Sequence, residues 1–351
     1  MAKRDFFIKE SELDDYQVVV LQKRVDKPSI VKGCAGSGKS ILALHRVKQI
    51  QEEKIGSFYF ILYTKALKQY MKDGINSIGL NSDKVLHYDK WRWRWRKEGE
   101  NWVKYDNAPN ADYIIVDEAQ DFSEEDIRLF KTKANKALIL FGDSAQQIYK
   151  FKTPEPISME QIAALTGIPS MDLMFNHRLP KKIARLAERI TDSDDELELR
   201  CKNEGVEMPK VLQFNSLNEQ LDKIIEIVNN RQFDDVGILF RHNEEVQTAK
   251  SYFDRKGFEV EAKINRDMDI DFESSNPKLT TYHSSKGLQF EAVFVPDCTV
   301  SDEDDRSPLY VAITRTYQSL FIMHSGNLSP FFNGTSDLYE TSLISKSSRR
   351  L

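Results

Sequence analysis

The chain of 351 residues is poor in cysteine and carries no large excess of one charge. Its three cysteines, Cys34, Cys201 and Cys298, show neither a disulfide pattern nor zinc-ligand spacing, which fits a reducing compartment. No apolar run approaches the roughly 20 residues that a membrane span needs, and the first residues form no apolar signal stretch. We therefore expect a cytoplasmic protein with no membrane partner. The net charge of −5 excludes a strongly basic protein, so any nucleic-acid site must be a local groove.

The composition that is present is ordinary for a globular protein, with 40% hydrophobic residues and a length that favours two domains. Apolar, β-rich runs alternate with helical patterns, which predicts βαβ units and parallel sheets. Strands are expected at Ser29–Lys32, Ser57–Tyr63, Tyr113–Val116, Ala137–Phe141, Val211–Phe214, Val236–Phe240, Phe258–Ala262, Ala292–Pro296 and Ser319–Met323. Helices are expected at Ser40–Glu53, Ser123–Lys133, Lys181–Ile190 and Leu217–Asn229. The proline-containing stretch 152–156 suggests domains at 1–153 and 154–335, followed by a polar tail at 336–351.

A glycine-rich segment lies between the first expected strand and the first expected helix. It fits the pattern G-x-x-x-x-G-K-[ST], which cradles phosphates with backbone N–H groups at a helix N-terminus. The phosphate-binding candidates are Gly33, Ala35, Gly36, Ser37, Gly38, Lys39 and Ser40. In this pattern the lysine reaches the β- and γ-phosphates of ATP, and Ser40 is a ligand of Mg²⁺.

A second polar cluster ends the apolar strand Tyr113–Val116. Asp117 stands where a carboxylate that binds Mg²⁺ is needed. Glu118 beside it is placed to orient or deprotonate the attacking water. Together with the glycine-rich segment, these two acids predict a P-loop site for ATP hydrolysis.

These two motifs together resemble superfamily 1 helicases of the UvrD/Rep type, and further segments follow in the order of that family. The matching segments are Phe141–Tyr149, Asn176–Arg178, Thr281–Phe290 and Tyr310–Arg315. The resemblance implies two RecA-like lobes with parallel sheets and an ATP site in the cleft between them. It spans roughly Tyr16 to Met323.

The resemblance also implies roles for individual residues around the nucleotide. Arg178 and Arg315 correspond to arginine fingers, whose guanidinium groups suit the charge that spreads over the γ-phosphate. Gln146 corresponds to a γ-phosphate sensor. The remaining cofactor-binding candidates are Gln17 at the adenine, His177 in place of a tyrosine that stacks on the base, Gly287, and Gln289 in place of a glutamate.

For nucleic acid, the resemblance implies contacts that use stacking aromatics and backbone-binding groups. The candidates of this kind are Thr64, Lys65, Tyr149, Phe151 and His283.

The segment from Trp91 to Arg96 alternates tryptophan with arginine. As a strand it places the tryptophans on one face and the arginines on the other, whereas in a helix Trp91 and Trp95 share a face. One interpretation is stacking on bases, with Trp91 as the candidate. The other is that the tryptophans pack on the first lobe while the arginines remain solvated.

The chain also departs from the larger UvrD/Rep enzymes, because it has no room for their two long insertions. It therefore resembles a two-lobe core, and the proline in Arg306–Leu309 suggests that the helix there begins late. The leading hypothesis is an ATP-dependent DNA helicase or single-stranded-DNA translocase moving 3′ to 5′, with RNA as an alternative track. A hypothesis of another class is an ATP-gated regulatory subunit that acts with a partner such as a nuclease, without unwinding duplex.

Overall fold

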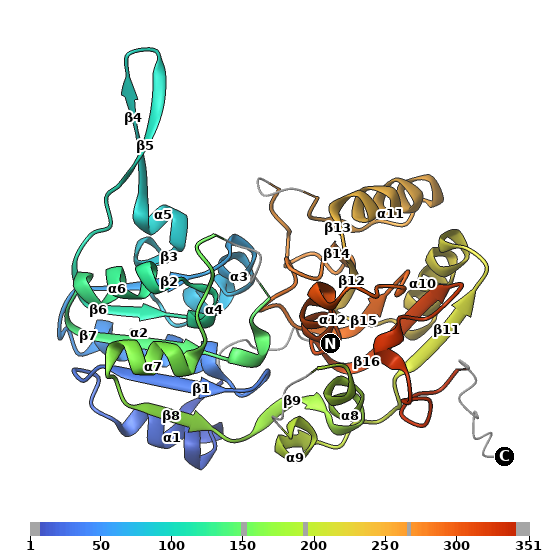
Figure 1. Cartoon of the computed structure of the whole chain (residues 1–351), viewed down its shortest axis with the longest axis horizontal. Coiled ribbons are helices and arrows are strands. Elements are labelled where there is room, and N and C mark those ends of the chain that lie inside the picture. The colour runs from blue at the N-terminus through green and yellow to red at the C-terminus, as the bar shows by residue number, and fades with distance from the viewer. Residues whose placement is uncertain (1–7, 149–152, 192–195, 265–267, 342–351) are drawn as a thin grey trace. The chain divides into compact units, whose positions relative to one another are not determined.

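Two compact units make up the chain, Ala2–Phe175 and Asn176–Leu351. The computed structural model describes residues 8–148, 153–191, 196–264 and 268–341 (Figure 1). Each unit holds one six-stranded sheet whose neighbouring strands all run parallel. The predicted α/β class with parallel sheets is therefore confirmed. Among the described residues, no helix combines the length and the apolar character needed to cross a bilayer.

The first unit has the strand order β3-β2-β6-β7-β1-β8. Its sheet strands are β1 (Ser29–Gly33), β2 (Phe58–Leu62), β3 (Val85–His87), β6 (Ala111–Val116), β7 (Ala134–Gly142) and β8 (Ser170–Leu173). Its helices are α1 (Asp15–Gln22), α2 (Lys39–Glu52), α3 (Lys65–Tyr70), α4 (Lys72–Ser77), α5 (Tyr88–Arg92), α6 (Glu124–Lys133) and α7 (Met159–Thr166). A separate antiparallel hairpin joins β4 (Trp93–Glu98) to β5 (Asn101–Asp106).

Both faces of the first sheet are buried, because successive strand residues point to opposite sides. Val31 and Ile115 belong to the core that the sheet forms with α2. Ile30 and Ile114, their neighbours in the chain, belong to a second core with α5, α6 and α7. Strands that are covered on both sides need apolar residues at nearly every position, which is why their runs stand out in the sequence.

The boundary between the units lies later than the sequence suggested. The prediction placed it after residue 153, whereas the compact units divide between Phe175 and Asn176. The reason is that β8 pairs with β1 as the edge strand of the first sheet, and α7 buries Met159 and Ile162 in the first unit's core. Short elements with exposed polar residues, such as β8, carry little apolar signal.

The second unit has the strand order β11-β16-β15-β12-β14-β13 and a further two-stranded sheet of β9 and β10. Its strands are β9 (Asn176–Pro180), β10 (Cys201–Asn203), β11 (Lys210–Phe214), β12 (Val236–Phe240), β13 (Glu261–Ala262), β14 (Lys278–Thr281), β15 (Phe290–Val295) and β16 (Thr316–Ser325). Its helices are α8 (Lys181–Ile190), α9 (Leu197–Arg200), α10 (Leu217–Arg231), α11 (Asn243–Lys256) and α12 (Arg306–Ile313).

One expectation for the second unit is wrong. Helix α12 begins at Arg306 and includes Pro308, because the N–H groups of a first helical turn have no partner within the helix and proline lacks only such a group. Within the predicted polar tail, Glu340 pairs with the sheet, and its backbone N–H donates to Pro209 O at 2.9 Å. Its carbonyl oxygen accepts from Val211 N at 2.8 Å, so this segment continues the pairing at the edge strand β11.

Trp91 fills the space between α5 and the first sheet. Its side chain is fully buried, and its ring lies 5.3 Å from Phe130 and 6.3 Å from Tyr88, measured between centroids. Replacing Trp91 by alanine leaves a cavity in this core, because the surrounding packed side chains relax only in part.

We expect Trp91→Ala to lower the free energy of unfolding of the first unit by about 3–5 kcal/mol, the usual cost of truncating a buried aromatic ring. Trp95→Ala is the matched control, because that side chain is 61% exposed and its loss changes stability by less than about 0.5 kcal/mol. Urea unfolding followed by far-ultraviolet circular dichroism measures both. Equal midpoints for the two variants would contradict the packing described here.

Candidate functional site

The glycine-rich loop connects the end of β1 to the start of α2. Gly36 and Gly38 adopt φ angles of 77° and 87°, a left-handed conformation that side chains with a Cβ rarely take. Gly38 directly precedes Lys39, the first residue of α2, so the loop's N–H groups and the positive end of the helix dipole are at the same place. The local fold is therefore that of a phosphate-binding loop, as the sequence predicted.

Gln17 holds helix α1 against this loop. Its side-chain nitrogen donates to Ser37 O at 3.0 Å, and its side-chain oxygen accepts from Asp14 N at 3.0 Å. A Cβ added at Gly38 would lie 2.5 Å from the Gln17 nitrogen. Gln17 thus lies next to the loop, as expected of a residue near the nucleotide, and a role at the adenine stays a prediction.

Lys39 and Ser40 point from the start of α2 towards the ends of the neighbouring strands. The Lys39 ammonium donates to the carbonyl oxygens of Gly33 at 2.7 Å and Cys34 at 3.0 Å. It also lies 3.9 Å from an Asp143 carboxylate oxygen. The Ser40 hydroxyl donates to Asp117 Oδ2 at 2.5 Å. The structure therefore brings the two predicted metal ligands, Ser40 and Asp117, into direct contact.

This pair fits Mg²⁺ by its chemistry. Mg²⁺ prefers hard oxygen ligands and is usually bound by one or two protein groups together with substrate phosphates and water. A hydroxyl and a carboxylate supply such oxygens. Among the described residues, no group of three or more histidines, cysteines or acids is placed to hold a metal ion.

Asp117 lies at the end of a buried strand, where the charged form of a carboxylate is unfavourable. Its side chain is fully buried, and burial, with the neighbouring Glu118 charge, raises its pKa to about 7. The hydrogen bond from Ser40 and the charge of Lys39 act in the opposite direction without cancelling this effect. A bound cation would stabilise the ionised carboxylate that the folded chain alone disfavours.

A chain of hydrogen bonds leads from Glu118 to Gln146. The Gln120 side-chain nitrogen donates to Glu118 Oε2 at 2.6 Å, and the Gln120 oxygen accepts from Asp143 N at 3.0 Å. The Gln146 nitrogen then donates to Asp143 Oδ2 at 2.6 Å. All four side chains are nearly fully buried. The sequence assigned no role to Gln120 or Asp143, although Gln120 lies two residues after Glu118 and Asp143 lies within the matching segment Phe141–Tyr149.

In the second unit, Arg178 and Arg315 both donate hydrogen bonds to Thr314. Arg178 donates from a terminal nitrogen to Thr314 O at 3.0 Å, and Arg315 donates to the Thr314 hydroxyl at 3.3 Å. Arg315 also donates through Nε to Val311 O at 2.9 Å, in the last turn of α12. Arg178 is 7% exposed and Arg315 is 2% exposed, so both side chains are enclosed by the second unit. Two segments 136 residues apart in the chain therefore meet at Thr314.

The other predicted residues of the second unit lie in strand β9 and in the segment between β14 and β15. His177 is exposed, directly before Arg178 in β9, where its imidazole is accessible for stacking. His283, Gly287 and Gln289 lie between β14 and β15, and Gly287 has a φ of 83° that favours glycine. Their roles at nucleotide or nucleic acid stay predictions.

The predicted nucleic-acid contacts lie in different environments in the structure. Thr64 accepts from Leu67 N at 3.1 Å and caps α3, which places the exposed Lys65 at the first turn of that helix. Tyr149 and Phe151 lie outside the described residues. The assignment of Trp91 is corrected: its ring is enclosed in the core on α5, so no face is available for a base.

We expect Asp117→Asn to stabilise the nucleotide-free protein at pH 8. The pKa of Asp117 is raised in the folded chain, so the native state holds its proton when the unfolded chain, near pKa 3.8, has released it. The free energy of unfolding of the wild-type protein therefore falls as pH rises from about 4 to about 7, by an amount on the order of 1–3 kcal/mol. The amide of the variant does not titrate and avoids this loss. The Ser40 hydroxyl can reverse its role and accept from the new amide.

Urea midpoints at pH 5 and pH 8 measure this effect, which should be larger at pH 8. Asp112→Asn is the control, because this acid lies at the other end of β6 and its hydrogen bonds from Ser57 lower its pKa. A less stable Asp117→Asn variant at both pH values would contradict the assignment.

Comparisons with known proteins agree with this geometry. Residues 17–152 match a family model described as AAA domain, and residues 279–323 match one described as UvrD-like helicase C-terminal domain. A Mycoplasma pneumoniae protein named "Probable DNA helicase" is 27% identical over 240 residues, which are 60% of this chain and 43% of that protein. The chain thus spans less than half the length of this curated relative.

Two solved structures of viral helicases are also similar. The PRRSV helicase has 16% identity and a TM-score of 0.46, with 94% of this chain and 57% of that chain covered. Arterivirus nonstructural protein 10, a helicase, has 15% identity and a TM-score of 0.44, with 89% and 62% covered. The two family matches follow the order of the motifs along the chain, and together with the curated relative they support a UvrD-like superfamily 1 helicase.

Proposed function

We propose that the chain is an ATP-dependent DNA helicase or single-stranded-DNA translocase that moves 3′ to 5′. The observation that carries the proposal is the buried hydrogen-bond chain from Glu118 through Gln120 and Asp143 to Gln146. A simple nucleotide-binding domain does not need its catalytic acid linked to the segment that leads towards Tyr149 and Phe151. A motor needs such a link, because each hydrolysis event must change a contact with the track.

For hydrolysis, the first unit supplies the phosphate and metal contacts. Lys39 binds the β- and γ-phosphates, and Ser40 and Asp117 hold Mg²⁺, which when bound neutralises charge on the phosphate oxygens. Glu118 orients the attacking water and accepts its proton. Arg178 and Arg315 donate to the γ-phosphate oxygens, where negative charge spreads in the transition state.

For binding the track, the proposal assigns the backbone of the nucleic acid to Thr64 and Lys65, and stacking on bases to Tyr149 and Phe151. His283 completes the contacts from the second unit. Stacking on aromatic rings tolerates any base, which suits a protein that moves along arbitrary sequence. Gln146 reports the state of the γ-phosphate to this segment.

The proposal is tested by ATPase rates with single-stranded DNA, duplex DNA and RNA, beside a strand-displacement assay. We expect single-stranded DNA to stimulate turnover. Lys39→Ala and Glu118→Gln should each lower stimulated kcat by at least about a hundredfold, since one loses the phosphate contact and the other the base. Lys48→Ala, on the same helix α2 but half exposed, is the control and should keep wild-type rates.

Glu118→Gln with a wild-type rate would remove the assignment of the base. A wild-type chain that hydrolyses ATP without stimulation by any nucleic acid would favour the regulatory subunit that acts with a partner such as a nuclease.

A second prediction concerns the hydrogen-bond chain itself. Gln120→Met keeps the length of the side chain but removes its hydrogen bonds to Glu118 and Asp143. We expect basal ATPase to stay within about threefold of wild type, while stimulation by DNA falls about tenfold, since Glu118 is no longer oriented from the Gln146 segment. The DNA concentration for half-maximal stimulation should not change.

Gln161→Met is the matched control for this variant, because it removes only a surface amide that caps α7. Equal loss of basal and stimulated rates in Gln120→Met would assign the residue a structural role instead of a coupling role.

A further inference from the structure

The hairpin of β4 and β5 presents two chemically different faces. Its strands pair from Trp93 with Asp106 to Glu98 with Asn101, so cross-strand partners project to the same side. One side, here called the tryptophan face, carries Trp93, Trp95, Lys97, Trp102, Lys104 and Asp106. The opposite side carries Arg94, Arg96, Glu98, Asn101, Val103 and Tyr105. In Figure 1 the hairpin extends away from the first sheet, beyond α5.

The tryptophan face exposes more aromatic surface than folding explains. Trp95 is 61% exposed and Trp102 is 64% exposed, whereas Trp91 on α5 is fully buried. Trp95 and Trp102 lie diagonally across the strand pair, because Trp95 faces Lys104 and Trp102 faces Lys97. Two neighbouring exposed indoles leave apolar surface in water. Exposed apolar patches of this kind are typical of interaction sites.

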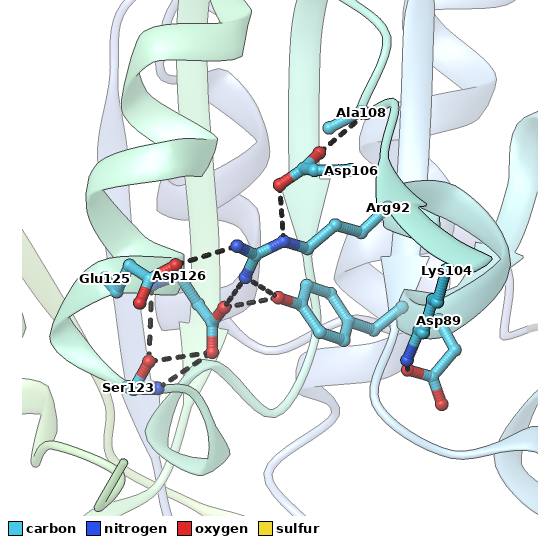
Figure 2. A network of polar contacts seen from close by, with 9 residues as sticks. Asp89, Arg92, Lys104, Asp106, Ala108, Ser123, Glu125 and Asp126 are labelled. Atoms are coloured by element: carbon cyan, nitrogen blue, oxygen red, sulfur yellow. Dashed lines mark hydrogen bonds and ion pairs between the residues drawn. The ribbon is translucent and has the colours of Figure 1, made fainter. Parts of the chain in front are cut away.

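The base of the hairpin is fixed to the first unit by Arg92 (Figure 2). Its guanidinium donates to Asp106 Oδ2, Asp126 Oδ1 and Glu125 Oε1, each at 2.7 Å, and to the Tyr88 hydroxyl at 2.6 Å. Arg92 directly precedes β4 and Asp106 ends β5, so one side chain joins both strands to α6. A hairpin held at its base loses less entropy on binding than a free one, so its exposed face is prepared to bind a ligand.

The charges around the face are positive in a chain of net charge −5. Residues 90–106 hold three acids, Glu98, Glu100 and Asp106, against six cations: Lys90, Arg92, Arg94, Arg96, Lys97 and Lys104. Asp106 pairs with Arg92, and Glu98 pairs with Arg96. The Asp89 carboxylate, 3.9 Å from Lys104 Nζ, offsets part of this charge.

The positive charge continues into the body of the first unit. Lys65, Lys68 and Lys90 all lie near His87, which directly precedes α5, and their charges act with burial to lower its pKa. Cations therefore extend from α3 to the base of the hairpin.

We propose that the tryptophan face binds an unpaired stretch of nucleic acid, with bases stacked on Trp95 and Trp102 and phosphates on Lys97 and Lys104. A protein partner fits less well, because the cores of protein interfaces are depleted in lysine, whereas alternating rings and cations match alternating bases and phosphates. This inference rests on the proposed function and adds a contact surface outside the segments with family motifs.

The composition offers a direct test. All four tryptophans of the chain lie between residues 91 and 102, so tryptophan fluorescence reports on this hairpin and its base. Titrating oligothymidylate into the full chain without nucleotide should quench this emission. In parallel, the anisotropy of a labelled oligothymidylate gives its affinity for each variant.

The double variant Trp95→Leu with Trp102→Leu should bind at least about tenfold more weakly, because leucine keeps apolar area but removes the stacking surface. Trp95→Phe with Trp102→Phe should restore most of the affinity. Tyr105→Leu, an aromatic replacement on the opposite face, is the matched control and should bind like wild type. ATPase without nucleic acid and the urea midpoint should be unchanged in every variant, which shows that the fold is intact.

Two results would overturn the inference, and they are distinguishable. If oligothymidylate stimulates the wild-type ATPase but leaves tryptophan emission unchanged, and the double leucine variant binds as tightly as wild type, the hairpin is not a contact surface and the proposed function stands. If wild type neither binds nor responds to any nucleic acid, the proposed function fails and this inference fails with it.

Discussion

The parallel order of β6, β7 and β1 is the constraint on which the candidate site depends. Since neighbouring strands run in the same direction, their carboxyl ends meet at one edge of the sheet. Asp117 follows β6, Asp143 follows β7, and the loop that ends in Lys39 follows β1. Contacts between Ser40 and Asp117, and between Lys39 and Asp143, join these ends. A different strand order would separate Ser40 from Asp117 and Lys39 from Asp143.

The same edge of the sheet concentrates charge where water is excluded. Burial next to Glu118 raises the pKa of Asp117, so the site is less stable by itself than an apolar strand end would be. That cost is a physical reason for a cation to bind there, since a positive charge would offset those of the two carboxylates. In the second unit Thr314 has the corresponding organising role, because its carbonyl and hydroxyl oxygens accept from Arg178 and Arg315.

The hairpin shows how a short segment can divide its residues between packing and binding. Of the alternating residues 91–96, Trp91 enters the core and Arg92 fixes the base of the hairpin, while Trp95 remains exposed. Packing on the first unit is therefore confirmed for Trp91, whereas stacking on bases is a proposal for Trp95. The change occurs where α5 ends and β4 begins, because the periodicity of the chain changes there from helical to alternating.

The sequence by itself determined the α/β class, the phosphate loop, the acidic strand end and the order of the family motifs. These features depend on local patterns: continuous apolar runs for doubly covered strands, and glycines where φ must be positive. Only the tertiary structure decided that β8 belongs to the first sheet, that α12 includes Pro308, and that Trp91 is enclosed while Trp95 is exposed. It alone also showed the contacts of Gln120 with Glu118 and Asp143, because hydrogen-bond partners and burial depend on which elements pack together, and no local pattern records that.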